Sequence, residues 1–340
     1  MIGLAYWIET LIRVGAGAGI LLTAAAVAVY LFLFKLVSFM QSRLGPMEAG
    51  PHGSLQLVAE VGKWLQKQDI IPDAADRTLF KIPPFIALGT TFLLFVVIPA
   101  GPNAVVANIP AGIFYILAVA SISILGTIIA GWASANKYAL MGAIRAAGQM
   151  IAYELPMVLA VVGVVIAAGT LNLQEIIAQQ AGGEIFGLSF LGNPYILTQF
   201  VGFGVFMIAV QAELGQTPFD MPIAESEVVG GYHIEYTGIR FLVFFLSEFA
   251  SAVGFSAVAA TLFLGGWQLP LSWGIPVGAM HAIGPLVILA KAIALTGLIF
   301  WARFSMPRLR EDQLQAFAWK VLIPVSLANI AITAILKVAL

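Results

Sequence analysis

Eight long apolar segments dominate this chain of 340 residues. A membrane-spanning α-helix needs about 20 apolar residues to cross the hydrocarbon core of a bilayer. Hydrophobic residues make up 61% of the chain and charged residues only 10%, whereas soluble domains carry about 25% charged residues. The sequence therefore predicts an all-α integral membrane protein, a single polytopic domain over residues 1–340. The eight predicted membrane helices cover about 14–37, 83–101, 111–132, 146–169, 195–213, 239–264, 281–301 and 318–338.

Positive charge is distributed unevenly among the connections between these segments. Of the 16 Lys and Arg residues, 13 lie in or beside the connections 38–82, 133–145, 214–238 and 302–317. Connections rich in Lys and Arg usually face the cytoplasm. Because the number of predicted helices is even, we expect both chain termini on the outer side of the membrane.

The first of these connections contains an amphipathic pattern between residues 53 and 67. Its apolar residues recur at helical spacing, while polar residues such as Glu60 and Lys63 occupy the other faces. This pattern is typical of a helix that lies in the membrane surface. Packing against a partner protein is the alternative. The apolar residues are Leu55, Val58, Val61, Trp64 and Leu65.

The segment from Gln211 to Arg240 is rich in acid and lies between two apolar runs. Placing one carboxylate near a bilayer interior costs about 2.5–3.5 kcal/mol even on lenient scales. Such a density of acid indicates proton handling, partner docking or divalent-cation binding, although the spacing is not that of an EF-hand. The five carboxylates, with no Lys or Arg between them, are Glu213, Asp220, Glu225, Glu227 and Glu235.

Three further ionisable residues lie inside predicted membrane helices, namely Glu154, Glu248 and Lys291. Residues of this kind usually face a bundle interior or a wet cavity. Neighbouring carboxylates raise one another's pKa, so a chain of them can pass protons near neutral pH. The sequence therefore predicts a proton relay, with a buried ion pair of Lys291 with Glu154 or Glu248 as the alternative. His233, beside Glu235, is either a proton donor or a hydrogen-bonded loop residue.

Several kinds of bound group are disfavoured by the composition. The chain has no cysteine, so it has no thiolate ligands for an iron–sulfur cluster or a zinc ion. Its three histidines are far apart in sequence, and its net charge of −1 does not favour a nucleic-acid partner. We expect no metal or flavin on this chain, so any redox centre would lie on a partner.

Five sequence blocks give the chain a strong resemblance to one family. They are QSRLGPMEAGPHGSLQ, DIIPDAADRTLF, GWASANKYALMGAIRAAGQMIAYE, AELGQTPFDMPIAESEVVGGYHIEYTGIRF and WARFSMPRLREDQLQAFAWK. In this order, the blocks resemble the quinone-site membrane subunit of respiratory complex I, the proton-pumping NADH:quinone oxidoreductase. Bacterial members of this family are the H subunits of that enzyme, and the likeness extends from about Lys35 to Asn329.

The resemblance implies eight membrane helices in a bacterial inner membrane, quinone as the substrate, and lipid around the bundle. It also implies partners, which are peripheral iron–sulfur and quinone-site subunits and neighbouring antiporter-like and small membrane subunits. A proton path is expected at Glu154, Glu213, Asp220, Glu225, Glu227, Glu248 and Lys291. The quinone chamber and its loop are expected at Arg43, Glu60, Lys63, Arg145, His233, Glu235 and Arg240.

The chain departs from the family at four places. This chain has Met47-Glu48-Ala49 where the family commonly has Asn-Arg-Val, and Gly215-Gln216 where it has Asn-Arg. It has Ile223 in place of a Glu, and Leu33-Phe34 in place of a Glu-Arg pair. One alternative is the related membrane subunit of an energy-converting hydrogenase or a ferredoxin-dependent complex. Others are a stand-alone ion-coupled transporter and a purely structural anchor.

Overall fold

Helices form every regular element in the part of the chain that the computed structural model describes, residues 4–182, 192–270, 274 and 276–339. Seven of the described helical segments are long and apolar enough to cross a membrane, with mean hydropathies of 1.8 to 2.4. The predicted class, a multi-pass all-helical membrane protein, is thereby confirmed. The predicted connections 170–194 and 265–280 lie partly outside the described residues. The seven segments are Thr10–Met40, Leu79–Val97, Gly112–Ala133, Lys137–Ala168, Gly238–Phe263, Gly278–Ser305 and Glu311–Ala339.

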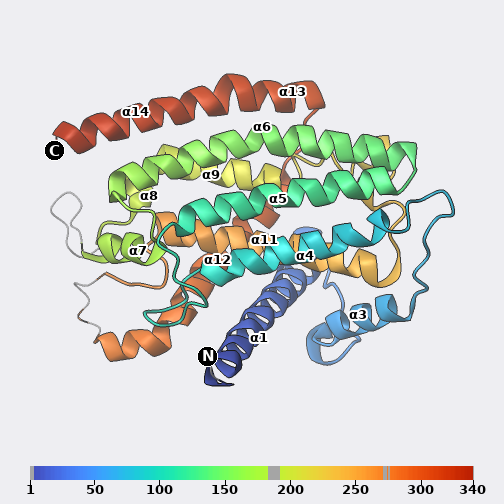
Figure 1. The fold of residues 1–340 in the computed structure, drawn as a ribbon, viewed down its shortest axis with the longest axis horizontal. Helices are drawn as coiled ribbons and strands as arrows, with labels where there is room; N and C mark the ends of the chain where they lie inside the picture. Colours follow the sequence, from blue (N-terminus) through green and yellow to red (C-terminus); the bar gives the residue numbers. More distant parts are fainter. Residues whose placement is uncertain (1–3, 183–191, 271–273, 275, 340) are drawn as a thin grey trace.

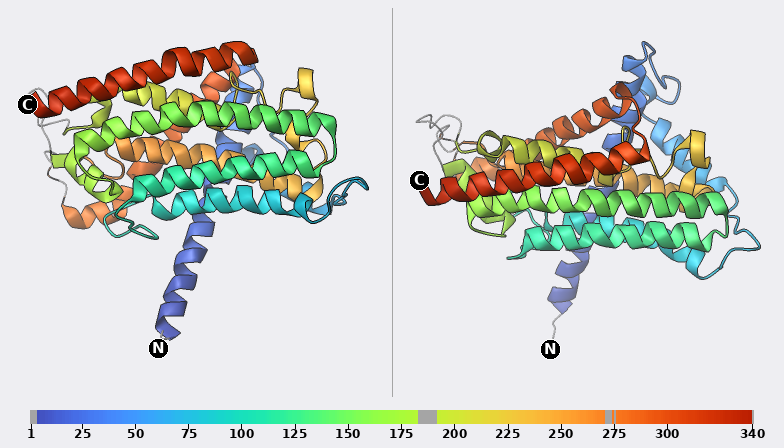
Figure 2. Two further views of the ribbon diagram at one scale, coloured as in Figure 1. Left: turned by 45° about the horizontal axis from the view of Figure 1, so that its top comes forward. Right: turned by 90° about the horizontal axis from the view of Figure 1, so that it is seen from above.

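The first helical segment is longer than the predicted range 14–37. Helix α1 (Leu4–Val27) continues through a π-helical stretch, Ala28–Leu36, into α2 (Val37–Met40). Both views in Figure 2 show α1 crossing the other helices at a steep angle, with its N-terminal end projecting from the bundle. Large apolar side chains on that end, such as Leu11 and Ile12, are exposed. Lipid or another membrane protein is therefore needed to cover them.

Helices α4 (Ile82–Val97), α5 (Gly112–Ala133) and α6 (Lys137–Ala168) form a consecutive layer (Figure 1). Helix α6 already begins at Lys137 because Asn136 caps it, its side-chain oxygen accepting a hydrogen bond from the Tyr138 amide (2.8 Å). The predicted connection 133–145 is therefore largely helical.

The fifth predicted span, 195–213, is divided into α8 (Tyr195–Thr198) and α9 (Phe200–Glu213). Gln199 interrupts the helix. Its side-chain nitrogen donates to Thr333 Oγ1 (2.7 Å), and its side-chain oxygen accepts from the Asn329 side-chain nitrogen (2.8 Å). The 14 residues of α9 extend about 21 Å, short of the roughly 30 Å hydrocarbon core. For this reason the structure has seven long spans where eight were predicted.

Helix α11 (Gly238–Phe263) lies at the centre of the bundle, and 67% of its most apolar 18-residue stretch is buried. Its second half is almost entirely small or aromatic, which lets neighbouring helices approach closely. Helix α12 (Val277–Ser305) packs on α11. Helices α13 (Glu311–Phe317) and α14 (Ile323–Ala339), joined by a π-helical turn, run along α6 (Figure 1).

The two ends of the bundle differ. One end carries α7 (Leu173–Gly182), whose Gln180 side chain donates to the Thr261 carbonyl of α11 (3.0 Å). The other end carries α3 (Gln56–Gln66) and the segment 214–237, with its short helix α10 (Glu225–Val228) and the turn Gly231–His233 (Figure 1). We call this second end the acidic end.

Candidate functional site

Two buried glutamines hold segment 214–237 over the acidic end. Gln149 of α6 donates to the carbonyls of Ala212 and Phe219, both at 2.7 Å. Gln211 of α9 donates to the carbonyls of Thr217 (2.7 Å) and Ile299 (3.2 Å). The start of the segment is thereby fixed to three helices.

Close backbone packing fixes the middle of the segment. Gly142 of α6 faces Gly231, and a Cβ atom at position 142 would lie 2.6 Å from the Gly231 Cα and 2.8 Å from the Pro222 carbonyl oxygen. Only glycine allows this approach.

A cavity of about 890 Å³ opens between this segment, α3, α11 and the end of α12. Aromatic side chains, including Phe241, Phe245 and Phe249, line one part of it, and charged side chains line another. A mostly apolar wall with a few convergent polar groups is typical of a ligand site. The charged and titratable lining residues are Lys67, Asp220, His233, Tyr236, Glu248, Arg303 and Arg308.

A second, smaller cavity of about 110 Å³ lies deeper, between α4, α5, α6 and α11. This volume is large enough to hold several waters. Two carboxylates, Glu213 and Glu248, line it together with the Tyr232 ring. Glu248 lines the larger cavity as well. Six hydroxyl side chains complete the polar wall, those of Thr90, Thr91, Ser123, Thr127, Ser247 and Ser251.

The carboxylates of the smaller cavity continue toward α5. Glu213 is 7% exposed, and its Oε2 has no hydrogen-bond partner among the described residues. Glu154 is near enough to act on Glu213 electrostatically, and it accepts a hydrogen bond from Ser121. Glu248, Glu213 and Glu154 therefore form a series from the larger cavity into the bundle.

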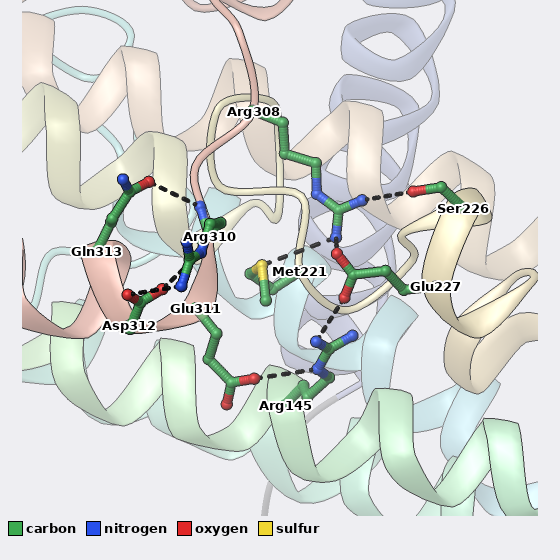
Figure 3. Close-up of polar contacts among 9 residues, drawn as sticks. All are labelled: Arg145, Met221, Ser226, Glu227, Arg308, Arg310, Glu311, Asp312 and Gln313. Carbon is green, nitrogen blue, oxygen red and sulfur yellow. Dashed lines mark hydrogen bonds and ion pairs between the residues drawn. The ribbon is translucent and has the colours of Figure 1, made fainter.

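Glu227 belongs to a different arrangement, a group of charged side chains around Arg145 and Arg308 (Figure 3), and its side chain is exposed. It lies between two arginines, at 2.5 Å from Arg145 and 3.3 Å from Arg308, and Arg145 also pairs with Glu311 (3.2 Å). The hydrogen bond from Arg145 lowers the pKa of Glu227, and the charges of Arg145 and Arg308 lower it further. Glu227 therefore stays ionised at neutral pH, as suits an anchor that ties α10 to α6 and the segment before α13.

His233 packs against aromatic rings beside the larger cavity. Its ring lies 3.9 Å from that of Tyr232 and 4.9 Å from that of Phe244, between ring centroids. Burial lowers the pKa of His233 to about 3 and raises the pKa of Tyr232, which the nearby Glu248 and Asp220 raise further. His233 is therefore neutral at physiological pH, and it is not a ready proton donor.

We expect His233 to make the acidic end less stable in mild acid. The unfolded segment binds a proton as the pH falls below 6.5, but the folded segment does so only near pH 3. Folding stability is therefore lost as the pH falls through this window, by at most about 1.4 kcal/mol per pH unit. Hydrogen–deuterium exchange of segment 229–237 between pH 7 and pH 5 measures it.

The His233→Gln variant should lose most of that pH dependence, because glutamine does not titrate. The His52→Gln variant is the control, since His52 is exposed. Equal pH dependence in the wild type and in His233→Gln would contradict this assignment.

The remaining residues expected from the sequence lie around the site. Arg240 pairs with Asp69 (2.9 Å), and Glu235 accepts a hydrogen bond from the Asn136 side chain (2.6 Å). Glu225 begins α10, and its side chain is outside what the structure describes.

Two of the expected basic residues and one acid lie on the outer parts of the acidic end. Lys63 pairs with Glu60 on α3, and Arg43 donates to the Gln41 side chain (2.8 Å). None of these three lines either cavity.

Lys291 lies apart from the acids. Its ammonium donates to three backbone carbonyls just beyond the end of α11, at 2.6, 2.8 and 3.1 Å. These carbonyls belong to Leu264, Gly266 and Gln268. Within the described chain, its hydrogen bonds are to backbone rather than to Glu154 or Glu248.

Sequence reasoning missed the hydroxyl lining and the amides Gln149 and Gln216. The pairs Ser123 and Thr127, and Ser247 and Ser251, are spaced four apart in apolar helices, which places each pair on one helix face. This spacing was the available signal. Metal ligation has no support in the described residues, where no group of three or more His, Asp and Glu side chains is arranged to hold an ion.

Fold and site together define a class, a multi-pass helical membrane protein with a chamber at one end and buried carboxylates leading from it. Comparison with known proteins identifies the family within this class. The family model described as NADH dehydrogenase matches residues 15–334. The chain is 45% identical to the H subunit of NADH-quinone oxidoreductase from Brevibacillus brevis over 301 residues, which is 88% of this chain and 85% of that protein.

The H subunit of the Bacillus mycoides enzyme is also 45% identical, over 304 residues, which is 89% of this chain and 86% of that protein. The chain belongs to this family, the H subunits of NADH-quinone oxidoreductase. The resemblance described from the sequence blocks is thereby confirmed. The matches favour neither a hydrogenase subunit nor a stand-alone transporter.

Proposed function

We propose that this chain is the membrane subunit of a proton-translocating NADH:quinone oxidoreductase, in which the larger cavity receives the quinone head group. The observation that carries this proposal is the position of Glu248, which lines both the larger and the smaller cavity. A group at that junction senses the reaction in one cavity and exchanges protons with the other.

The proton path that we propose runs from Glu248 through water in the smaller cavity to Glu213 and then to Glu154. Reduction of a quinone creates proton demand beside Glu248, and the hydroxyl side chains provide acceptors that order the intervening water. Asp220, at the larger cavity, contributes charge near the head group. Glu227 anchors the segment instead of carrying protons.

The electrons come from a partner. We propose that a peripheral iron–sulfur subunit docks on the acidic end and closes the larger cavity, and that NADH is the ultimate donor. The exposed charges around Glu227 and Glu311 suit a polar interface of this kind. Antiporter-like and small membrane subunits, together with lipid, would cover the exposed apolar helix faces.

Eight membrane passes are proposed, with α8 and α9 together forming the one that the long helices lack. Residues 195–213 would extend about 28 Å as a helix, close to the roughly 30 Å needed. The acidic end would face the cytoplasm of a bacterial cell, and both termini would lie on the outer side.

Helix α3 is proposed to lie in the membrane surface at the mouth of the larger cavity. Its apolar residues Val58 and Leu65, and Leu55 just before it, are exposed, which suits contact with lipid. Trp64 stacks on Phe241 of the cavity wall, with ring centroids 4.6 Å apart. This contact links the surface helix to the chamber.

The Glu154→Gln and Glu213→Gln variants test the path. We expect both to assemble and to lose coupled quinone reduction by about tenfold or more, because glutamine cannot carry a proton. Quinone reduction and proton pumping are measured together in inverted membrane vesicles. Glu175→Gln, an exposed acid on α7 at the other end, is the matched control. Full pumping in both path variants would overturn the assignment.

A further inference from the structure

Gln216 joins Arg303 to Glu248 through two hydrogen bonds. Its Oε1 accepts from the Arg303 guanidinium, and its Nε2 donates to the Glu248 carboxylate. The side chain is only 2% exposed. The direct distance from Arg303 Nη1 to Glu248 Oε1 is 3.6 Å, whereas an ionic hydrogen bond measures about 2.7–2.9 Å. The amide is therefore the main connection between the two charges.

The backbone around Gln216 is fixed from two sides. Its backbone N–H donates to the Gln211 backbone carbonyl (3.2 Å), and its backbone carbonyl accepts from the Phe219 backbone N–H (2.8 Å). The Gln211 side chain in turn bonds the carbonyl of Ile299 on α12 (3.2 Å), one helical turn before Arg303. The amide is thus held in position relative to Arg303 by the same contacts that fix the loop.

The chemistry of the three groups gives the amide one orientation. A guanidinium only donates hydrogen bonds and an ionised carboxylate only accepts them, so the amide oxygen faces Arg303 and the amide nitrogen faces Glu248. If Glu248 takes up a proton, its hydroxyl needs an acceptor. The oxygen of the adjoining Gln216 amide is already held by Arg303. The other titratable groups that face Glu248 are Asp220 and Tyr232.

We propose that Gln216 is a positioning residue that links the protonation state of Glu248 to the placement of Arg303 at the larger cavity. The amide keeps the two charges from closing into a direct ion pair, which would hold Glu248 ionised. Protonation of Glu248 competes for the amide oxygen and releases Arg303 into the cavity. This inference rests on the proposed place of Glu248 in the proton path.

Two variants of Gln216 should shift the pH profile of coupled quinone reduction in opposite directions. Gln216→Met removes the amide and lets Arg303 pair directly with Glu248, so the profile should move to lower pH. Gln216→Glu engages Arg303 and places a second negative charge beside Glu248, so the profile should move to higher pH. We expect shifts of about one pH unit, which is a tenfold change in proton affinity.

The measurement uses the assembled complex in membranes, with Gln149→Met as the control. Gln149 is also buried, but its amide bonds two backbone carbonyls, so its loss should lower thermal stability without moving the profile. Unchanged profiles, shifts in the same direction, or failure of both Gln216 variants to assemble would overturn the inference.

Failure of this inference is distinguishable from failure of the proposed function. Full coupling in Glu248→Gln would refute the proton path itself. Loss of coupling in Glu248→Gln, together with wild-type profiles in both Gln216 variants, would refute only the role of Gln216.

Discussion

Replacing Glu248 by glutamine is expected to lower coupled quinone reduction on the order of 10²-fold, because a group in proton transfer contributes about that much. Glutamine has nearly the same shape, and its amide oxygen can still accept from Gln216, so the fold should be retained. In the described structure, Glu248 is the only residue that lines both the larger and the smaller cavity. The variant removes its titratable carboxyl group. Turnover and proton pumping in membrane vesicles measure the effect.

Asp312→Asn is the control for this experiment. Asp312 is an exposed acid at the same end of the bundle, and its pair with Arg310 is a surface ion pair (3.1 Å), which contributes little. Its neutralisation should leave turnover and pumping unchanged. Wild-type pumping in Glu248→Gln would show that protons reach the bundle by another route.

Replacing Gly142 by valine is expected to separate segment 214–237 from α6. The new Cβ would lie 2.6 Å from the backbone of Gly231, and neither backbone can move without breaking other contacts. Overpacking of this kind lowers the free energy of unfolding by about 1–3 kcal/mol. We expect a value at the upper end of this range because the contact is between two backbones. We expect a lower unfolding temperature and loss of quinone reduction, since the segment forms one wall of the larger cavity.

Gly148→Val provides a matched control on the same helix. A Cβ atom there meets only the end of the flexible Gln315 side chain, at 3.8 Å. The same residue change should therefore be tolerated. If Gly142→Val kept wild-type stability and turnover, the close packing of the segment on α6 would not be what holds the cavity wall.

The class of the fold and the depth of the acids could be predicted from the sequence, because both depend on local hydropathy. Glu154 and Glu248 stand out as carboxylates inside apolar runs. The division of the fifth span could not be predicted, because it depends on Gln199 bonding Thr333, 134 residues away. Local sequence contains no information about such a contact.

The contacts among the charged side chains of the site could not be predicted from the sequence either. Glu227 and Glu213 both lie in the acidic segment, yet one is held between two surface arginines and the other lies buried beside a cavity. Lys291 was expected among the acids, and the structure instead directs its ammonium to the carbonyls beyond α11. Tertiary packing decides which charges meet, and spacing alone does not.

Infrared difference spectroscopy on the assembled complex tests the central claim most directly. The spectrum with quinone reduced is subtracted from the spectrum with quinone oxidised, and carboxyl bands report acids that change protonation. We expect a carboxyl signal in the wild type that disappears in Glu248→Gln and persists in Glu175→Gln. A carboxyl signal that is identical in the wild type and in Glu248→Gln would contradict the proposal that Glu248 couples the quinone cavity to the buried acids.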